Sequence, residues 1–70
     1  MKFTVVIVED LEEGGYNATV PALPGCRTSG ESIEEALHNA HDAIGGYIAS
    51  LKKHREPIPR EAESRVMVYP

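Results

Sequence analysis

The sequence predicts an α+β fold of order β-β-β-α-β, in which a four-stranded mixed sheet carries one long helix on one face. Three observations predict it: β-branched segments near both ends, apolar residues recurring every three or four positions across the middle, and proline or glycine between these segments. Two hairpins place the third strand parallel to the first, and a right-handed crossover returns the last strand beside the first. The expected strand order is therefore 3-2-1-4.

The first two strands are expected over residues 2–9 and 16–20, joined as a hairpin. In the first strand both alternating sets are β-branched or aromatic, which is typical of a strand that is apolar on both faces: Phe3, Val5, Ile7 and Thr4, Val6, Val8. The polar residues 10–15 end in two glycines and predict the turn.

A rigid bend and a short third strand are expected next. Pro21 and Pro24 cannot donate ladder hydrogen bonds, so the second strand has to stop near residues 21–25. Residues 26–29 are long enough for a short strand that runs back, and Gly30 releases the chain into the next element.

The helix is predicted by its periodic apolar residues, which span five turns and are Ile33, Ala36, Leu37, Ala40, Ala43, Ile44, Tyr47, Ile48 and Leu51. Ser32 and Glu35 predict a capping box at its start, and the positive charge of residues 52–55 suits the dipole at its end. Pro57 and Pro59 stop the helix, so residues 55–63 are expected as an extended connector and residues 64–69 as the last strand.

One helix covers only one face of the sheet, whereas the first and last strands are apolar on both faces. The open face is therefore expected to meet another copy of the chain or a partner, and we expect at least a homodimer. Val66 and Val68 of the last strand are candidate interface residues, as are Gly45 and Gly46. Two glycines in mid-helix cost about 2 kcal/mol relative to alanine; they either admit a neighbouring subunit or kink the helix.

Composition and charge favour a globular protein with a basic protein partner. Of the residues, 41% are hydrophobic and 26% charged. The net charge is −4, with eight acids against two bases in residues 1–42 and three acids against five bases in residues 43–70. The single Cys26 cannot form an internal disulfide, and no signal-like start or membrane-length apolar run is present, so we expect a cytoplasmic protein.

The stretch from Tyr16 to Ala36 resembles the signature of HicB-like antitoxins. In that family an aromatic-led strand ends in proline, a Leu-Pro-Gly-Cys turn follows, and glycine, an acid and Ser or Thr precede a Glu-Glu-Ala helix start. The positions that match residue for residue are Leu23 to Cys26, Gly30, Glu35 and Ala36. Ala22 departs from the family, which commonly has an acidic residue there. The resemblance continues through Ile58 and Pro59 to the terminal strand.

The resemblance implies a partial RNase H-like fold and the role of an antitoxin in a type II toxin-antitoxin system. Such a protein binds and occludes a HicA-like toxin that cleaves messenger RNA, and it has no catalytic residue, cofactor or metal of its own. Family members often add a C-terminal DNA-binding segment. We expect residues 1–70 to form a single domain without that segment, and therefore no direct DNA binding and no membrane association.

The bend is the candidate partner-binding surface, because prolines hold the backbone rigid and lower the entropy lost on binding. The candidate residues are Pro21, Leu23, Pro24 and Gly25. The alternative is that these residues form only a structural corner.

No catalytic or metal site is expected. A nuclease would need carboxylates that converge from strands and helix, whereas the acidic residues 9–13 fall in a solvated turn. His38 and His41 lack a third ligand, and His38 is expected to contact Asp42 one turn away. Cys26 shows no pattern of a neighbouring base and is expected to be a small buried hydrophobe.

Two other functions stay open from the sequence. The chain could be an orphan homo-oligomer with a structural or regulatory role. It could also bind nucleic acid weakly, without interleaved aromatic residues for base stacking, through Lys52, Lys53, Arg55, Arg60 and Arg65.

Overall fold

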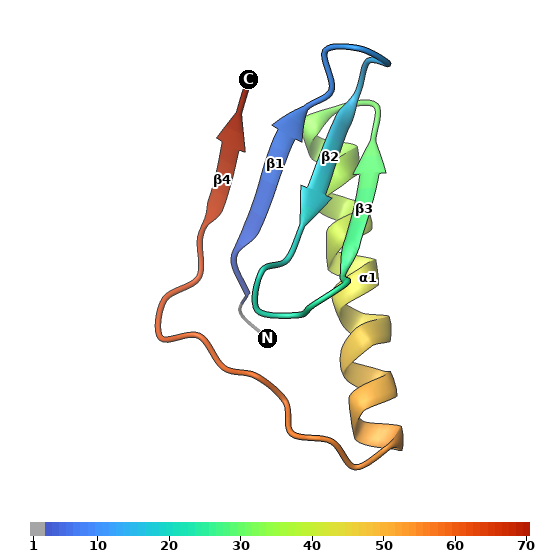
Figure 1. Ribbon diagram of the computed structural model, residues 1–70, viewed down its shortest axis with the longest axis vertical. Helices are drawn as coiled ribbons and strands as arrows, with labels where there is room; N and C mark the ends of the chain where they lie inside the picture. The colour runs from blue at the N-terminus through green and yellow to red at the C-terminus, as the bar shows by residue number, and fades with distance from the viewer. Residues whose placement is uncertain (1–2) are drawn as a thin grey trace.

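The computed structural model describes residues 3–70 and shows five elements in the expected order (Figure 1). These elements are β1 (Val5–Glu9), β2 (Tyr16–Thr19), β3 (Arg27–Gly30), α1 (Ile33–Lys53) and β4 (Val66–Tyr69). The strand order is β3-β2-β1-β4, with β1 antiparallel to β2 and parallel to β4, which confirms the expected topology. The first strand begins later than expected, at Val5; the predicted start at Lys2 lies outside the described residues.

The register decides which side chains share a face, because directly opposite residues of neighbouring strands point the same way. Val5 and Ile7 of β1 are buried on the helix side, and their partners on β4 are Val66 and Val68. The open side of the same two strands carries Val6, Val8, Met67 and Tyr69. The open side of β2 and β3 carries Asn17, Thr19, Arg27 and Ser29. The expectation of an apolar open face is therefore correct only for the half formed by β1 and β4.

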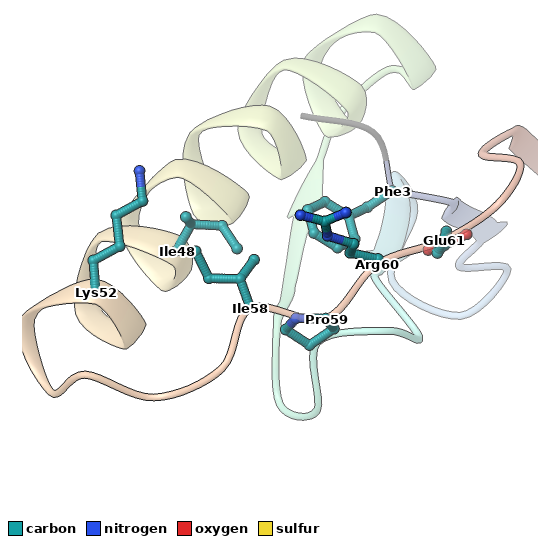
Figure 2. A pocket seen from close by; sticks show the side chains of 7 residues that line it. All are labelled: Phe3, Ile48, Lys52, Ile58, Pro59, Arg60 and Glu61. Atoms are coloured by element: carbon teal, nitrogen blue, oxygen red, sulfur yellow. The ribbon is translucent and has the colours of Figure 1, made fainter.

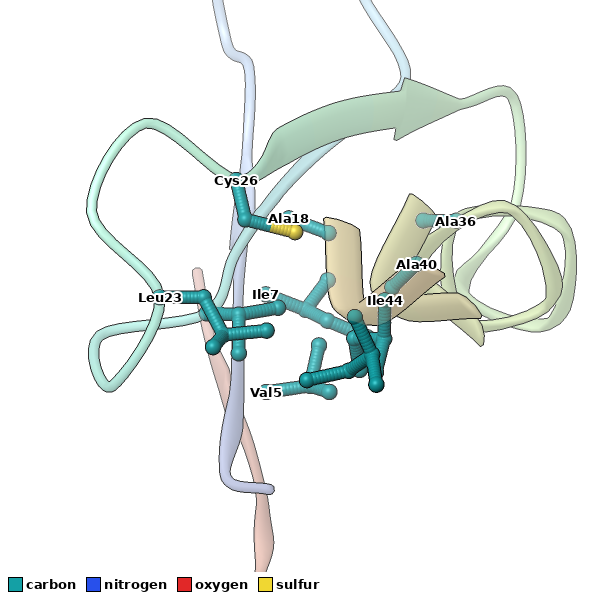
Figure 3. Packing of buried hydrophobic residues seen from close by; sticks show 10 residues of the cluster. Val5, Ile7, Ala18, Leu23, Cys26, Ala36, Ala40 and Ile44 are labelled. Atoms are coloured by element: carbon teal, nitrogen blue, oxygen red, sulfur yellow. The ribbon is translucent and has the colours of Figure 1, made fainter. Parts of the chain in front are cut away.

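The core lies between α1 and the sheet, and its buried strand residues belong to β1 and β2 (Figure 3). Small residues, Ala36 and Ala40, face the sheet near the start of α1, so helix and sheet approach closely there. Ile44 and Ile48 fill the wider space further along the helix. Within residues 3–70, α1 has Cα atoms within 8 Å of Cα atoms in β1, β2 and β3, whereas no such pair joins α1 and β4. The helix therefore leaves one edge of its own face of the sheet uncovered.

Residues next to α1 in the sequence cap both of its ends. The Ser32 hydroxyl accepts a hydrogen bond from the amide of Glu35 at 3.1 Å, and the Glu35 carboxylate accepts one from the amide of Glu31 at 2.9 Å. The first bond confirms the Ser32 half of the predicted capping box, and in the other half Glu35 binds the amide of Glu31 instead of that of Ser32. At the other end Arg55 has a φ of 56°, the left-handed conformation that usually selects glycine after a helix.

Residues 54–65 form a connector that returns to the sheet, and Glu61 attaches it to the start of β1. The Glu61 carboxylate accepts hydrogen bonds from the amide of Thr4 at 2.9 Å and from its hydroxyl at 2.7 Å. The amide of Arg65 donates to the Thr4 hydroxyl at 3.3 Å, and the amide of Val5 donates to the Arg65 carbonyl at 3.0 Å. These bonds hold β4 beside β1.

Candidate functional site

The bend at residues 21–25 is a preformed structure attached to α1. The hydroxyl of Tyr47 donates a hydrogen bond to the Pro24 carbonyl at 2.8 Å, which joins the bend to the helix. Gly25 has a φ of 82°, a conformation that other residues adopt only at a cost. Pro21, Pro24 and Gly25 are exposed, so these three of the four predicted partner-binding residues are accessible.

Leu23, the fourth residue predicted for this surface, is a core residue with 0% exposure. Figure 3 shows its side chain among the apolar side chains beneath the bend, near Ile7. Its amide donates to the Val20 carbonyl and its carbonyl accepts from the Cys26 amide, both at 2.9 Å. Its predicted contact with a partner is corrected, because the folded sheet and helix enclose its side chain. Leu23 holds the bend in place instead.

An acidic hollow lies at the other end of β2 from the bend, and residues of the β1–β2 turn and of the start of α1 line it. The hollow has a volume of about 680 Å³, and its acidic lining residues are Asp10, Glu13, Glu31 and Glu35. The Asp10 carboxylate accepts hydrogen bonds from the amides of Glu13 at 3.0 Å and Glu12 at 3.1 Å, and these bonds hold the pKa of Asp10 below its usual value. This end therefore presents a fixed negative potential to solvent.

β4 forms an exposed apolar edge that includes both valines predicted for an interface. Val66 is 51% exposed and Val68 is 46% exposed on the helix side, while Tyr69 is 45% exposed on the open side. The strand sequence Val-Met-Val-Tyr contains no charge. Soluble proteins usually shorten, charge or cover such an edge to prevent pairing with other chains. The apolar surface that runs around β4 is therefore a candidate interaction surface.

A groove separates α1 from the returning chain, because the helix does not reach β4. Its wider part has a volume of about 390 Å³ and is shown in Figure 2, lined by Phe3, Ile48, Lys52, Ile58, Pro59, Arg60 and Glu61. A second hollow of about 240 Å³ shares Phe3 and extends between α1 and β4 to Val66. The sequence pattern contains no signal for this groove, since it depends on how far the helix extends across the sheet.

Gly45 and Gly46, the other predicted interface residues, lie on the exposed side of α1. The helix continues unbroken from Ile33 to Lys53 through both glycines. A Cβ atom added at either position would meet nothing within 4 Å. Packing within residues 3–70 therefore does not require these glycines, and their role in an interface stays a prediction.

The remaining titratable candidates show no assembled reaction centre. His38 Nε2 lies 3.5 Å from Asp42 Oδ2 on the surface, which confirms the predicted contact, and His41 borders the hollow between α1 and β4. Cys26 is 7% exposed, and burial raises the pKa of its thiol, which confirms its role as a small buried hydrophobe. Over residues 3–70, no three His, Cys, Asp or Glu side chains gather where they could hold a metal ion.

The basic residues of the C-terminal half are distributed along the helix end and the connector. Lys52 and Arg60 line opposite ends of the groove in Figure 2, and Glu61 lies next to Arg60. The Arg65 guanidinium lies 3.3 Å from the Glu63 carboxylate. Acidic residues therefore interrupt the positive charge.

Over the described part of the chain, no helix has the length and apolar character to cross a membrane.

Three side chains make contacts that the sequence pattern does not reveal. Tyr47 belongs to the periodic apolar set, but its hydroxyl reaches the Pro24 carbonyl. Glu61 lies in the connector, but binds Thr4. Asn39 Nδ2 donates to the Ser29 carbonyl of β3 at 2.8 Å. Each contact joins segments that are distant in sequence, so the local pattern of apolar and polar residues does not pair them.

Comparison with known proteins identifies the family. Residues 3–68 match the family described as HicB_like antitoxin of bacterial toxin-antitoxin system. The chain is 52% identical over 69 residues to UPF0150 protein Ta0767 of Thermoplasma acidophilum, covering 99% of each chain. It is 39% identical over 54 residues to Antitoxin HicB 1 of Photorhabdus laumondii, covering 77% of this chain and 35% of that protein.

A solved structure gives the same assignment. The N-terminal domain of Burkholderia pseudomallei antitoxin HicB superposes with a TM-score of 0.75 at 31% identity, covering 87% of this chain and 71% of that one. The β3-β2-β1-β4 sheet with its single long helix, which was expected from the sequence, is thus the fold that this chain shares with a HicB antitoxin domain. The chain therefore belongs to the HicB-like antitoxin family of toxin-antitoxin systems.

Proposed function

We propose that this protein binds a HicA-like, messenger RNA-cleaving toxin and blocks it by steric occlusion. The observation that carries the proposal is the family match, which extends over residues 3–68. In such a complex the antitoxin supplies a surface and the toxin supplies all of the chemistry. Covering the toxin's RNA-cleaving site is then sufficient for inhibition, and the complex forms in the cytoplasm, where the messenger RNA is translated.

The proposed contact surface is the exposed part of the bend, formed by Pro21, Pro24 and Gly25. The hydrogen bond from Tyr47 to the Pro24 carbonyl and the buried side chain of Leu23 hold this surface before any partner arrives. A surface that is already ordered loses little conformational entropy on binding. The bend therefore supports tight binding through a small number of residues.

The acidic hollow at the other end of β2 is proposed to attract the toxin from a distance. A protein that binds RNA carries positive charge on its binding surface. The carboxylates of Asp10, Glu13, Glu31 and Glu35 line the hollow and complement such a surface. Charges of this kind mainly raise the association rate, so the rate should fall as salt is added.

Co-expression with the product of the adjacent short, basic reading frame tests the proposal. The wild-type chain should restore growth and form a complex on a sizing column. Pro21→Lys should weaken binding at least tenfold, because it places a charged side chain at the exposed bend, whereas Ala62→Lys on the exposed connector should bind normally. Continued toxicity with the wild-type chain, and no complex on the column, would contradict the proposal.

Self-association is proposed to accompany toxin binding. The exposed valines of β4, Val66 and Val68, favour an interface between copies. The same observation favours the second candidate function, an orphan homo-oligomer with a regulatory role. If the neighbouring reading frames encode no small basic protein, and the chain still forms oligomers, the second function is the better account.

A further inference from the structure

We infer that β4 pairs in antiparallel fashion with β4 of a second copy, across a two-fold axis normal to the sheet. This pairing would join two four-stranded sheets into one sheet of eight strands. The inference rests on the proposed self-association and names its surface, but it does not depend on toxin binding. It starts from the position of β4, which is the outermost strand next to β1 and carries apolar side chains on both faces.

The backbone of β4 leaves hydrogen-bonding groups at the free edge. The Arg65 carbonyl accepts from the Val5 amide at 3.0 Å, so the peptide groups of Arg65 face β1. Because these groups alternate along a strand, those of Met67 and Tyr69 also face β1, and the N–H and C=O groups of Val66 and Val68 face away from it. A further strand can bind these four groups.

A second copy of β4 has the chemistry that this edge requires. The pairing strand has to be apolar on both faces, and β4 carries Val66 and Val68 on one face and Met67 and Tyr69 on the other. A two-fold axis normal to the sheet keeps each face on its own side, so apolar side chains meet apolar side chains on both. The other edge strand, β3, is a poorer match because its sequence Arg-Thr-Ser-Gly is polar, and Asn39 already occupies its Ser29 carbonyl.

The register centred on Met67 uses all four outward groups within β4. In this register Val66 of each copy exchanges two N–H···O bonds with Val68 of the other, and the two Met67 residues face each other at the axis. A cation–π contact is compatible with this register: Arg65 of each copy, whose guanidinium also lies 3.3 Å from Glu63, faces the ring of Tyr69 of the other. No charged residue faces a like charge.

The size of the interface predicts a reversible dimer. A four-residue strand with its neighbours buries less than the roughly 1,200 Å² of total surface found in stable complexes. We therefore expect dimerisation to be half complete at a concentration on the order of 10 μM.

A disulfide at the axis tests the register. Opposite residues of a non-hydrogen-bonded pair have Cα atoms about 4.5 Å apart, which is within the range of a disulfide. Oxidised Met67→Cys should therefore run as a covalent dimer on a non-reducing gel. Thr19→Cys, on the exposed open side of β2, should stay monomeric. The buried Cys26 is present in both variants and in the wild-type chain. The wild-type chain therefore shows how much covalent dimer Cys26 forms by itself.

Sedimentation of the purified chain over a range of concentrations tests the edge independently. Val68→Lys should weaken dimerisation at least tenfold, and Thr19→Lys should leave it unchanged; thermal melts by circular dichroism show that each variant is folded. A chain that stays monomeric at about 1 mM would overturn self-association together with the edge pairing. A dimer that persists in Val68→Lys, with no disulfide in Met67→Cys, would overturn the edge pairing alone.

Discussion

The two edge strands of the sheet have the same length but different surroundings. β3 lies under α1, where Asn39 donates a hydrogen bond to the Ser29 carbonyl at 2.8 Å and Gly30 lies against the backbone of Ala36. β4 has no helix above it, and Val66 and Val68 are about half exposed. The helix of the same chain thus covers the β3 edge, whereas the β4 edge is accessible to a second strand.

The two edge strands also differ in polarity, and the helix covers the polar strand and not the apolar one. The polar strand Arg-Thr-Ser-Gly is the covered one, and the apolar strand Val-Met-Val-Tyr is the uncovered one. A sheet built only for the stability of a monomer would cover the apolar edge, because burial of apolar surface stabilises by about 25 cal/mol per Å². In this molecule, β4 keeps Val66, Val68 and Tyr69 about half exposed, so a second polypeptide can still bury apolar surface there.

The largest effect is expected from breaking the closed edge. In Gly30→Ala the new Cβ would lie 2.4 Å from the Ala36 amide nitrogen and 2.8 Å from the Ala36 Cα atom, which are backbone atoms with little freedom to move. We expect a loss of about 2 to 3 kcal/mol in the free energy of unfolding, or a melting temperature lower by about 10 to 20 °C. Gly46→Ala is the matched control, because its Cβ would meet nothing within 4 Å. A melting temperature close to that of the wild type would show that β3 is not held by this contact.

The next effect concerns the attachment of the open edge. Glu61→Ala removes both hydrogen bonds to Thr4, which should cost about 1.5 to 2 kcal/mol, because bonds to a charged acceptor are stronger than average. Amide hydrogen exchange should accelerate in β4 more than in β3. Glu63→Ala, which removes only the exposed pair with Arg65, should change little. Equal acceleration in both strands would mean that the two edges unfold as one unit.

A smaller effect, of opposite sign, tests the competing interface on α1. Gly45→Ala and Gly46→Ala should each stabilise the protein by about 1 kcal/mol, because both positions are helical, exposed and free of neighbours. Dimerisation, measured by sedimentation, should be unchanged if the interface is at β4. Loss of the dimer in either variant would show that the interface lies on α1 and not at β4.

The smallest effect is expected at the β1–β2 turn, which belongs to neither edge strand. The amides of Glu13 and Glu12 lower the pKa of Asp10, so its carboxylate stabilises the fold above the ordinary value of 3.8, and this contribution is lost as the pH falls through the lowered pKa. Asp10→Ala should therefore melt slightly below the wild type at pH 6 and together with it near pH 2. A difference that persists at low pH would assign the effect to backbone geometry instead of charge.

Much of the fold can be predicted from local pattern. The cap formed by Ser32 and Glu35 and the three- and four-residue spacing of apolar positions were sufficient to place α1, and the prolines placed the bend and the connector. Chain topology then predicted the strand order. The candidate site was less predictable: Val66 and Val68 are exposed as expected, whereas Leu23 is buried.

The sequence by itself determined the order of the elements, the start of the helix, their apolar sides and the family, because each of these depends on residues that are close together along the chain. Only the tertiary structure decided that α1 covers β3 and leaves β4 open, that Leu23 is enclosed and that Glu61 holds the connector to Thr4. The spacing of apolar residues shows which side of a helix is apolar. The lateral position of the helix on the sheet depends instead on the side-chain volumes of segments that are distant in sequence and pack together. The close approach of Gly30 to the backbone of Ala36 is such a place, and it lies where the start of the helix crosses β3.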